Sequence, residues 1–122
     1  MFLATNPHNH IGRVIGNGHC VPFVQHVSRV PHTSQWRRGN LVRSGTTPSR
    51  TIIATFHPET GRYENDTTGR SHAAVFLDEV PNGLRVLDQW VGRPVGERVI
   101  QFRNRVGMWV NDGDRFYVVR TA

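Results

Sequence analysis

Lysine is absent from this chain of 122 residues, so its 15 basic side chains are all arginine, against 9 acidic residues and a formal net charge of +6. Cysteine occurs once, which excludes an internal disulfide framework and a multi-cysteine zinc site. No apolar run approaches the ~18 residues of a membrane span, and the N-terminus lacks a basic region followed by an apolar run. We therefore predict no membrane span and no signal peptide, and a chain made in the cytoplasm that needs a delivery route to act elsewhere.

The length predicts one domain, because 122 residues fall below the ~150 that a domain typically has. Apolar residues make up 37% of the chain, and 12 glycines bring the composition into the ordinary range of folded proteins. We expect residues 1–122 to form a single domain that is a monomer.

Regular structure is predicted to begin at Cys20. Five apolar residues recur at the spacing that places them on one face of a helix: Cys20, Phe23, Val24, Val27 and Val30. Pro22 is tolerated in the first turn of a helix, and Pro31 marks its end. The pattern predicts one amphipathic helix with Cys20 at its N-terminus.

The rest of the chain favours strands rather than helices. Residues 31–50 are rich in Gly, Ser, Thr and Asn, which predicts a long irregular connection. Short runs rich in Val, Ile, Phe and Tyr follow at 51–56, 72–77, 84–90, 99–102 and 116–119. One early helix and about five later strands indicate an α+β fold with an antiparallel sheet.

Cys20 has two interpretations. A lone cysteine on an apolar stripe is commonly a small buried hydrophobe. A helix N-terminus, however, places unpaired N–H groups and partial positive charge beside the sulfur, which lowers the pKa of a thiol toward a reactive thiolate.

A nucleophilic cysteine needs a histidine to hold its proton and a polar group to orient that histidine. His72 opens an apolar strand, although a solvent-facing histidine at a strand end would look the same in sequence. On the next strand, alternation places Asp88 on the face of Leu84 and Val86, where a carboxylate requires a partner. An imidazole N–H of His72 would be such a partner.

These segments carry a family resemblance in their order along the chain. Residues 17–25 (NGHCVPFVQ), 69–77 (GRSHAAVFL) and 86–90 (VLDQW) resemble the papain-like cell-wall peptidases of the NlpC and CHAP types. The resemblance covers nearly the whole chain, since residues 51–56 and 113–119 look like further strands of that fold. It implies a papain-like fold in which an N-terminal nucleophile helix packs on the sheet.

The resemblance also implies a Cys20 nucleophile, His72 as general base and acid, and Asp88 as the group that orients it. The backbone N–H of Cys20 would supply one oxyanion donor, and a side chain just before it, Asn17 or His19, the second. The substrate would be an amide bond in a peptidoglycan stem peptide, and no cofactor is implied.

The short length and the missing signal resemble the small amidase toxins that bacteria deliver through type VI secretion, or the lytic modules of phages. Such a toxin would act on the cell wall in the periplasm of a target cell and would have a cognate immunity protein. The sequence has His19-Cys20-Val-Pro where the family commonly has Asp-Cys-Ser-Gly, which leaves the substrate class open.

Other residues are candidates for binding. The loop after the helix would place Trp36 as one wall of a cleft and Arg37 or Arg38 against a substrate carboxylate, with Gln89 as a further contact. An exposed basic loop anchored by one tryptophan is the alternative. No carboxylate or cysteine lies near His8 and His10, so we expect no metal site.

Two other function classes compete with the hydrolase. The arginine excess suggests a basic nucleic-acid-binding module, but the arginines are scattered from Arg13 to Arg120 and no recognition motif is present. A catalytically inactive papain-like docking domain would share the fold.

The hairpin that joins the strands of His72 and Asp88 tests whether these residues can belong to one triad. A strict two-residue turn at Asn82-Gly83 would separate His72 from Asp88 by roughly 16 Å along the strands. We therefore predict a broader loop centred near residue 80, or a bulge with the same effect.

Overall fold

A computed structural model describes residues 1–66 and 68–121 of the chain. It contains one α-helix, α1 (Cys20–Val27), which is followed by a six-stranded sheet. The strands are β1 (Trp36–Leu41), β2 (Ile52–Thr55), β3 (Ala73–Val80), β4 (Gly83–Trp90), β5 (Arg93–Gln101) and β6 (Phe116–Thr121). Short 3-10 helices occur at Pro7–His10, Thr33–Gln35, Val42–Ser44, Trp109–Asn111 and Gly113–Arg115.

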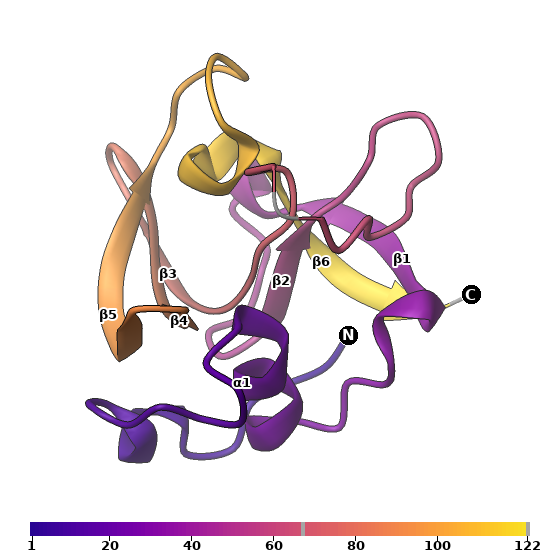
Figure 1. The fold of residues 1–122 in the computed structure, drawn as a ribbon. Helices are drawn as coiled ribbons and strands as arrows, with labels where there is room; N and C mark the ends of the chain where they lie inside the picture. The colour runs from indigo at the N-terminus through magenta and orange to yellow at the C-terminus, as the bar shows by residue number, and fades with distance from the viewer. Residues whose placement is uncertain (67, 122) are drawn as a thin grey trace.

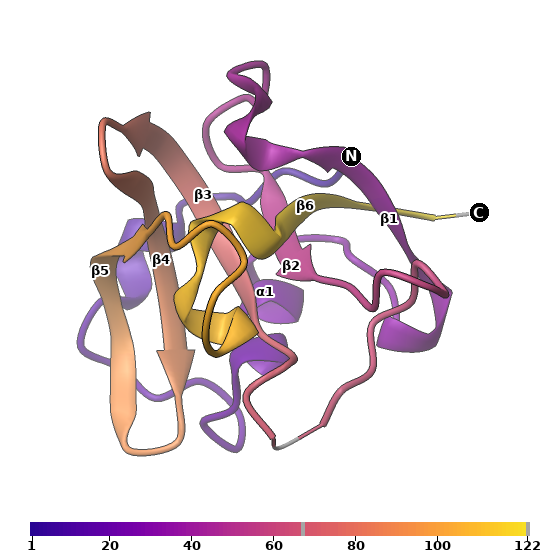
Figure 2. The ribbon, with the colours of Figure 1, turned by 90° about the horizontal axis from the view of Figure 1, so that it is seen from above.

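Every neighbouring pair of strands is antiparallel, in the order β1-β6-β2-β3-β4-β5. β3, β4 and β5 lie on one side of β2, and β6 and β1 on the other (Figure 2). The single helix packs against β3 and β4 (Figure 1). The predicted α+β class with a helix on an antiparallel sheet is confirmed, with six strands in place of about five.

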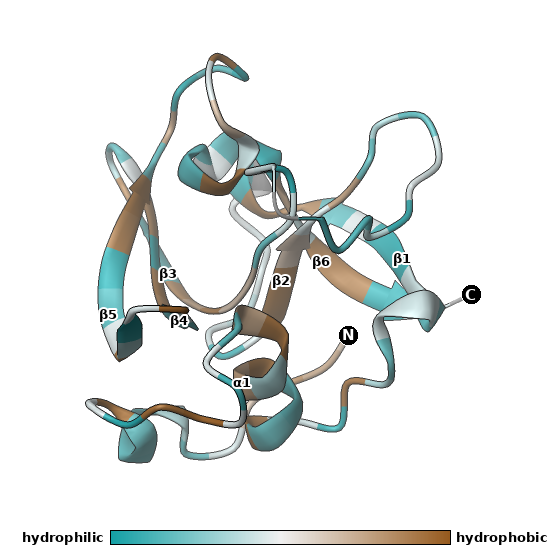
Figure 3. Ribbon diagram, in the orientation of Figure 1, coloured by the Kyte–Doolittle hydropathy of each residue, from teal (hydrophilic) through white to brown (hydrophobic). Residues whose placement is uncertain are grey.

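The two faces of the sheet carry separate apolar clusters because strand residues alternate between faces. β2 is drawn largely in brown in Figure 3 because its sequence, IIAT, is mostly hydrophobic, and its residues are all buried. The helix-side cluster includes Phe23, Val24, Val27, Ile52, Val75 and Leu87. The opposite cluster includes Ile53, Phe76, Leu84, Val86, Ile100 and Phe116.

Helix α1 ends at Val27, three residues before the predicted end at Val30. The Ser28 hydroxyl donates to the carbonyl of Val24 at 2.6 Å and accepts the N–H of Val30 at 3.2 Å. These local bonds replace the backbone ladder of the helix. Val30 nevertheless stays buried, as the apolar stripe predicted.

The edge strands are the elements that the sequence pattern missed, β1 in full and β5 in its first part. β1 lies in the stretch predicted to be an irregular connection, and its polar sequence WRRGNL suits an edge that pairs only with β6. β5 begins at Arg93 rather than Val99. It includes Pro94, which an edge strand tolerates because one side of its backbone forms no ladder.

The β3–β4 hairpin differs from both predicted turns. Val80 pairs with Gly83, so the turn is a tight one at Pro81-Asn82, and the broad loop centred near residue 80 is wrong. A register shift between Phe76 and Asp78 then moves the pairing by one residue, a smaller change than the predicted bulge, which would have placed Asp88 opposite His72. Continued in this register, Trp90 lies opposite His72, and Asp88 is its diagonal neighbour, within reach of a long side chain.

Candidate active site

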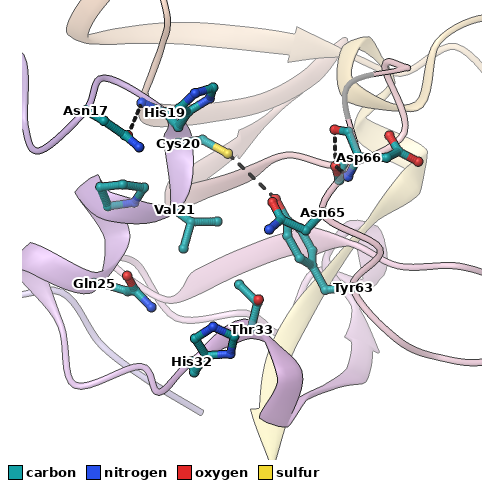
Figure 4. Close-up of a pocket in the computed structure, with 12 residues that line it drawn as sticks. Asn17, His19, Cys20, Val21, Gln25, His32, Thr33, Tyr63, Asn65 and Asp66 are labelled. Carbon is teal, nitrogen blue, oxygen red and sulfur yellow. Dashed lines mark hydrogen bonds between the residues drawn. The ribbon is translucent and has the colours of Figure 1, made fainter.

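Cys20 is the first residue of α1 and lines a cavity of about 380 Å³ (Figure 4). The preceding residue, His19, has an extended backbone at the helix N-cap, and its N–H donates to the Asn17 side-chain oxygen at 3.1 Å. Cys20 is partly buried against the helix-side cluster. Its thiol therefore faces a cavity while its backbone N–H belongs to the free end of the helix.

Gln89 on β4 fixes the loop that leads to the nucleophile. Its side-chain nitrogen donates to the carbonyls of Ile15 and His19, both at 2.8 Å, and its oxygen accepts the N–H of Ile15 at 2.9 Å. Gln89 is fully buried. It is therefore a positioning residue for the loop, and the expectation that it contacts substrate is wrong.

Tyr63 lies beside the nucleophile, and sequence reasoning missed it. Its hydroxyl is 3.7 Å from the Cys20 sulfur, as the dashed line in Figure 4 marks. Its ring packs on Trp36 and Phe56 with centroid distances of 4.9 Å and 6.5 Å. Burial, followed by the neighbouring Cys20, raises the pKa of Tyr63, so the hydroxyl keeps its proton and can donate it in a hydrogen bond. A lone aromatic residue in a polar loop is the signal that could have found it.

His72 is held by both neighbouring strands just before β3. Its N–H donates to the Thr55 hydroxyl at 3.1 Å, and its carbonyl accepts the N–H of Thr55 at 3.0 Å. Its ring Nε2 lies 2.7 Å from Oδ2 of Asp88, which is fully buried on β4. Nδ1 is the ring nitrogen that remains for the Cys20 thiol.

Two arginines of β5 share the Asp88 carboxylate with His72. Arg98 donates through Nε to Oδ2 at 2.8 Å, and Arg93 donates through Nη1 to Oδ1 at 3.1 Å. Both guanidinium groups also stack on Trp90, 4.6 Å and 4.8 Å from its ring centroid for Arg93 and Arg98. A buried carboxylate needs such partners. The arginines on the unpredicted part of β5 were not foreseen as members of the site.

The three central groups shift one another's protonation. Burial opposes charge on Cys20, but hydrogen bonding and charge from His72, with the Ala73 backbone and Tyr63, lower the pKa of the thiol below its ordinary value. Burial likewise opposes the imidazolium, but Asp88 and Cys20 raise the pKa of His72 to about 9. The pKa of Asp88 is lowered despite its burial, chiefly by His72. This pattern favours a thiolate, an imidazolium and a carboxylate in sequence.

The predicted binding residues on β1 do not line this site. Trp36 has 0% exposure and donates through Nε1 to the carbonyl of Pro31 at 2.9 Å, so the prediction that it forms a cleft wall is wrong. Arg37 caps the carbonyls of Ser34 and Trp36. Arg38 lines a different cavity and stacks on Tyr117.

No group of three or more potential metal ligands forms among residues 1–66 and 68–121. His10 packs edge-on against His26 at 4.9 Å, and His8 lies 3.9 Å from Glu97. Nor does any helix in the described part of the chain combine the length and apolar character that crossing a membrane requires.

Comparison with known proteins gives a consistent result. The family described as "Domesticated amidase effector 2" matches residues 1–119. The type VI secretion amidase effector 2 protein of Salmonella typhi is 42% identical over 78 residues, covering 62% of this chain and 56% of that protein. The domesticated amidase effector 2 of Ixodes scapularis is 37% identical over 89 residues, covering 71% of this chain and 58% of that protein.

A solved structure, that of type 6 secretion amidase effector 2 (Tae2), superposes with a TM-score of 0.82 at 29% sequence identity. The match covers 98% of this chain and 94% of the Tae2 chain. The chain spans a little over half the length of the two curated relatives. Because the family match extends over nearly all of its residues, the chain belongs to the domesticated amidase effector 2 family.

Proposed function

We propose that this chain is a cysteine amidase that hydrolyses amide bonds in peptidoglycan stem peptides. The observation that carries the proposal is the link from the Cys20 thiol through the His72 ring to a buried carboxylate, with Nε2 of His72 2.7 Å from Asp88. The names of the relatives, amidase effectors of type VI secretion, support the same activity.

Each group has a role in the reaction. The Cys20 thiolate attacks the carbonyl carbon of the scissile amide, and a tetrahedral oxyanion forms. Protonated His72 gives its proton to the leaving amine as the C–N bond breaks and a thioester remains. His72 then takes a proton from water, the resulting hydroxide attacks the thioester, and the thiolate departs. Asp88 orients the ring and stabilises the imidazolium.

The oxyanion needs donors that are already in place. The backbone N–H of Cys20 is the first. The Tyr63 hydroxyl is the second donor that the geometry favours, because it is 3.7 Å from the sulfur and its raised pKa keeps it protonated. Asn17 also lines the cavity; its oxygen accepts the His19 N–H, and its amide nitrogen is the alternative second donor.

The proposal includes a biological setting. The enzyme would reach the periplasm of a target cell by type VI delivery and act there on the cell wall as a monomer. A cell that makes it would need an immunity protein against its own enzyme. The names of the type VI relatives support this setting.

Digestion of purified sacculi, with the released fragments identified by mass spectrometry, tests the proposal. Wild-type protein is expected to release peptide fragments with one new amine and one new carboxylate, which also identifies the bond. Cys20→Ala should release none while circular dichroism shows it folded. Arg37→Gln, which changes a residue that does not line the Cys20 cavity, is the matched control and should retain activity. Equal release by wild type and Cys20→Ala would overturn the cysteine mechanism.

A further inference from the structure

A second cavity, of about 370 Å³, lies on the His72 side of the site. His72, Trp90, Arg98 and Asn111 contribute to its lining, and Asp66 and Ser71 line both this cavity and the one that contains Cys20. The nucleophile therefore faces one cavity and the general base the other. A substrate whose scissile amide lies at Cys20 can extend into both.

The mechanism determines which part of the substrate enters the second cavity. His72 must reach the leaving nitrogen to protonate it. The part of the substrate that departs as the amine therefore lies on the histidine side, and the part that forms the thioester lies on the Cys20 side.

The wall of the second cavity offers unused hydrogen-bond donors. An arginine has five N–H donors. Arg98 uses Nε on Asp88 at 2.8 Å, and its Nη2 lies 3.5 Å from Nε2 of His72. Within residues 1–66 and 68–121, no acceptor is bonded to its Nη1. Its side chain is 22% exposed and lines the cavity.

The surroundings hold this guanidinium in one place. Asp88 fixes its Nε edge, and the ring of Trp90, 40% exposed, lies 4.8 Å from its carbon centre. A stacked and tethered arginine loses little freedom when it binds a planar anion, which favours a carboxylate. Asp66, at the junction of the cavities, carries negative charge and disfavours an anion there.

We infer that the second cavity is the subsite for the leaving-group amino acid of the substrate, and that Arg98 binds a free carboxylate on that residue. The assignment of sides rests on the proposed function, whereas the carboxylate preference is a property of binding alone. The structure thus assigns a substrate class: amides whose amine half bears a free carboxylate, in preference to those in which it is amidated.

Binding can be measured without turnover in the Cys20→Ala protein. The probes are stem peptides purified from sacculi, in their native form and after conversion of their carboxylates to carboxamides. Calorimetry is expected to show about tenfold or greater preference for the native form, the scale of a charge-assisted hydrogen bond. Adding Arg98→Gln should abolish the preference, and adding Arg98→Lys, which retains a charge beside Asp88, should reduce it.

Arg93 provides a matched control. It contacts the same carboxylate and the same tryptophan ring but does not line the cavity. Arg93→Gln should therefore keep the preference even if it weakens binding of both probes. A preference that survives Arg98→Gln, or one that Arg93→Gln removes equally, would overturn the subsite. If wild-type protein fails to cut sacculi while the Arg98-dependent preference persists, the proposed hydrolysis fails and the carboxylate subsite stands.

Discussion

Asp88 and Gln89 are adjacent on β4, and they position opposite halves of the candidate site. Asp88 points to one face of the sheet and bonds His72, whereas Gln89 points to the other and bonds the loop before Cys20. Both are fully buried. One strand therefore holds both the base and the loop that leads to the nucleophile.

The two halves differ in the kind of interaction that holds them. Gln89 makes only neutral hydrogen bonds, to the backbone of Ile15 and His19. Asp88 is the centre of a charged network with His72, Arg93 and Arg98. The position of the loop before Cys20 should therefore respond little to pH, while the pairing of Asp88 with His72 should depend on pH strongly.

Removing the base is expected to have the largest effect on activity. His72→Ala should lower kcat/KM on sacculus-derived peptides on the order of 10³-fold, because the thiolate loses its cation and the leaving amine its proton donor. The thiol pKa should rise, since burial then acts without an opposing charge. A rate of fragment release equal to that of wild type would contradict the assignment of His72.

Neutralising the charged half should have the next largest effect. Asp88→Asn should lower kcat/KM on the order of 10²-fold. It should also lower the pKa of His72, measured by the NMR shifts of the ring across pH. A ring that still titrates at about 9 would show that Asp88 does not set its protonation.

The same pair gives stability a defined pH dependence. The folded pKa of His72, about 9, lies above the ordinary 6.5, so its protonation stabilises the fold at pH below 6.5 and this contribution is lost as pH rises through about 9. Chemical denaturation of Asp88→Asn should show a flatter profile over that window than wild type. Parallel profiles for the two proteins would count against the linkage.

Removing the neutral hydrogen bonds of Gln89 should lower activity less than the changes at His72 and Asp88, and it should also lower stability. Gln89→Leu leaves three part-buried backbone groups without their partner, which should cost about 2 kcal/mol of unfolding free energy. By displacing the loop it should lower kcat on the order of 10-fold. The pKa of His72 should not change. A shift of that pKa as large as in Asp88→Asn would erase the distinction between the halves.

Trp36 should have the smallest effect on activity and a large one on stability. Trp36→Ala removes a fully buried ring from beneath Tyr63 and should cost about 3 kcal/mol or more. Trp36→Phe keeps most of the packing, and its folded protein should cut sacculi within about twofold of wild type. A selective loss of turnover in Trp36→Phe without loss of stability would restore Trp36 as a substrate contact.

The helix, the buried strands and the pairing of His72 with Asp88 could be predicted because each leaves a local mark. An apolar stripe marked α1, and a carboxylate on the face of Leu84 and Val86 called for a partner. The edge strands left no such mark, since β1 is polar and β5 contains Pro94.

Other parts of the site depend on tertiary contacts that spacing does not encode. Gln89 meets Ile15 across 74 residues, and Tyr63 meets Cys20 across 43. Trp36 was assigned to a cleft because its neighbours are polar, yet β1 turns its ring inward against Tyr63. The sequence pattern identified the residues that can carry out the reaction, but it did not identify the residues that surround them.

The pH dependence of Cys20 alkylation tests the central claim, that Cys20 and His72 form a thiolate–imidazolium pair. Iodoacetamide modification of the single cysteine can be followed by intact mass in wild type, His72→Ala and Gln89→Leu. Wild-type and Gln89→Leu proteins are expected to react as a thiolate well below the ordinary thiol pKa of 9.0, and His72→Ala is expected to lose this reactivity. A single titration at the ordinary thiol pKa, unchanged by His72→Ala, would contradict it.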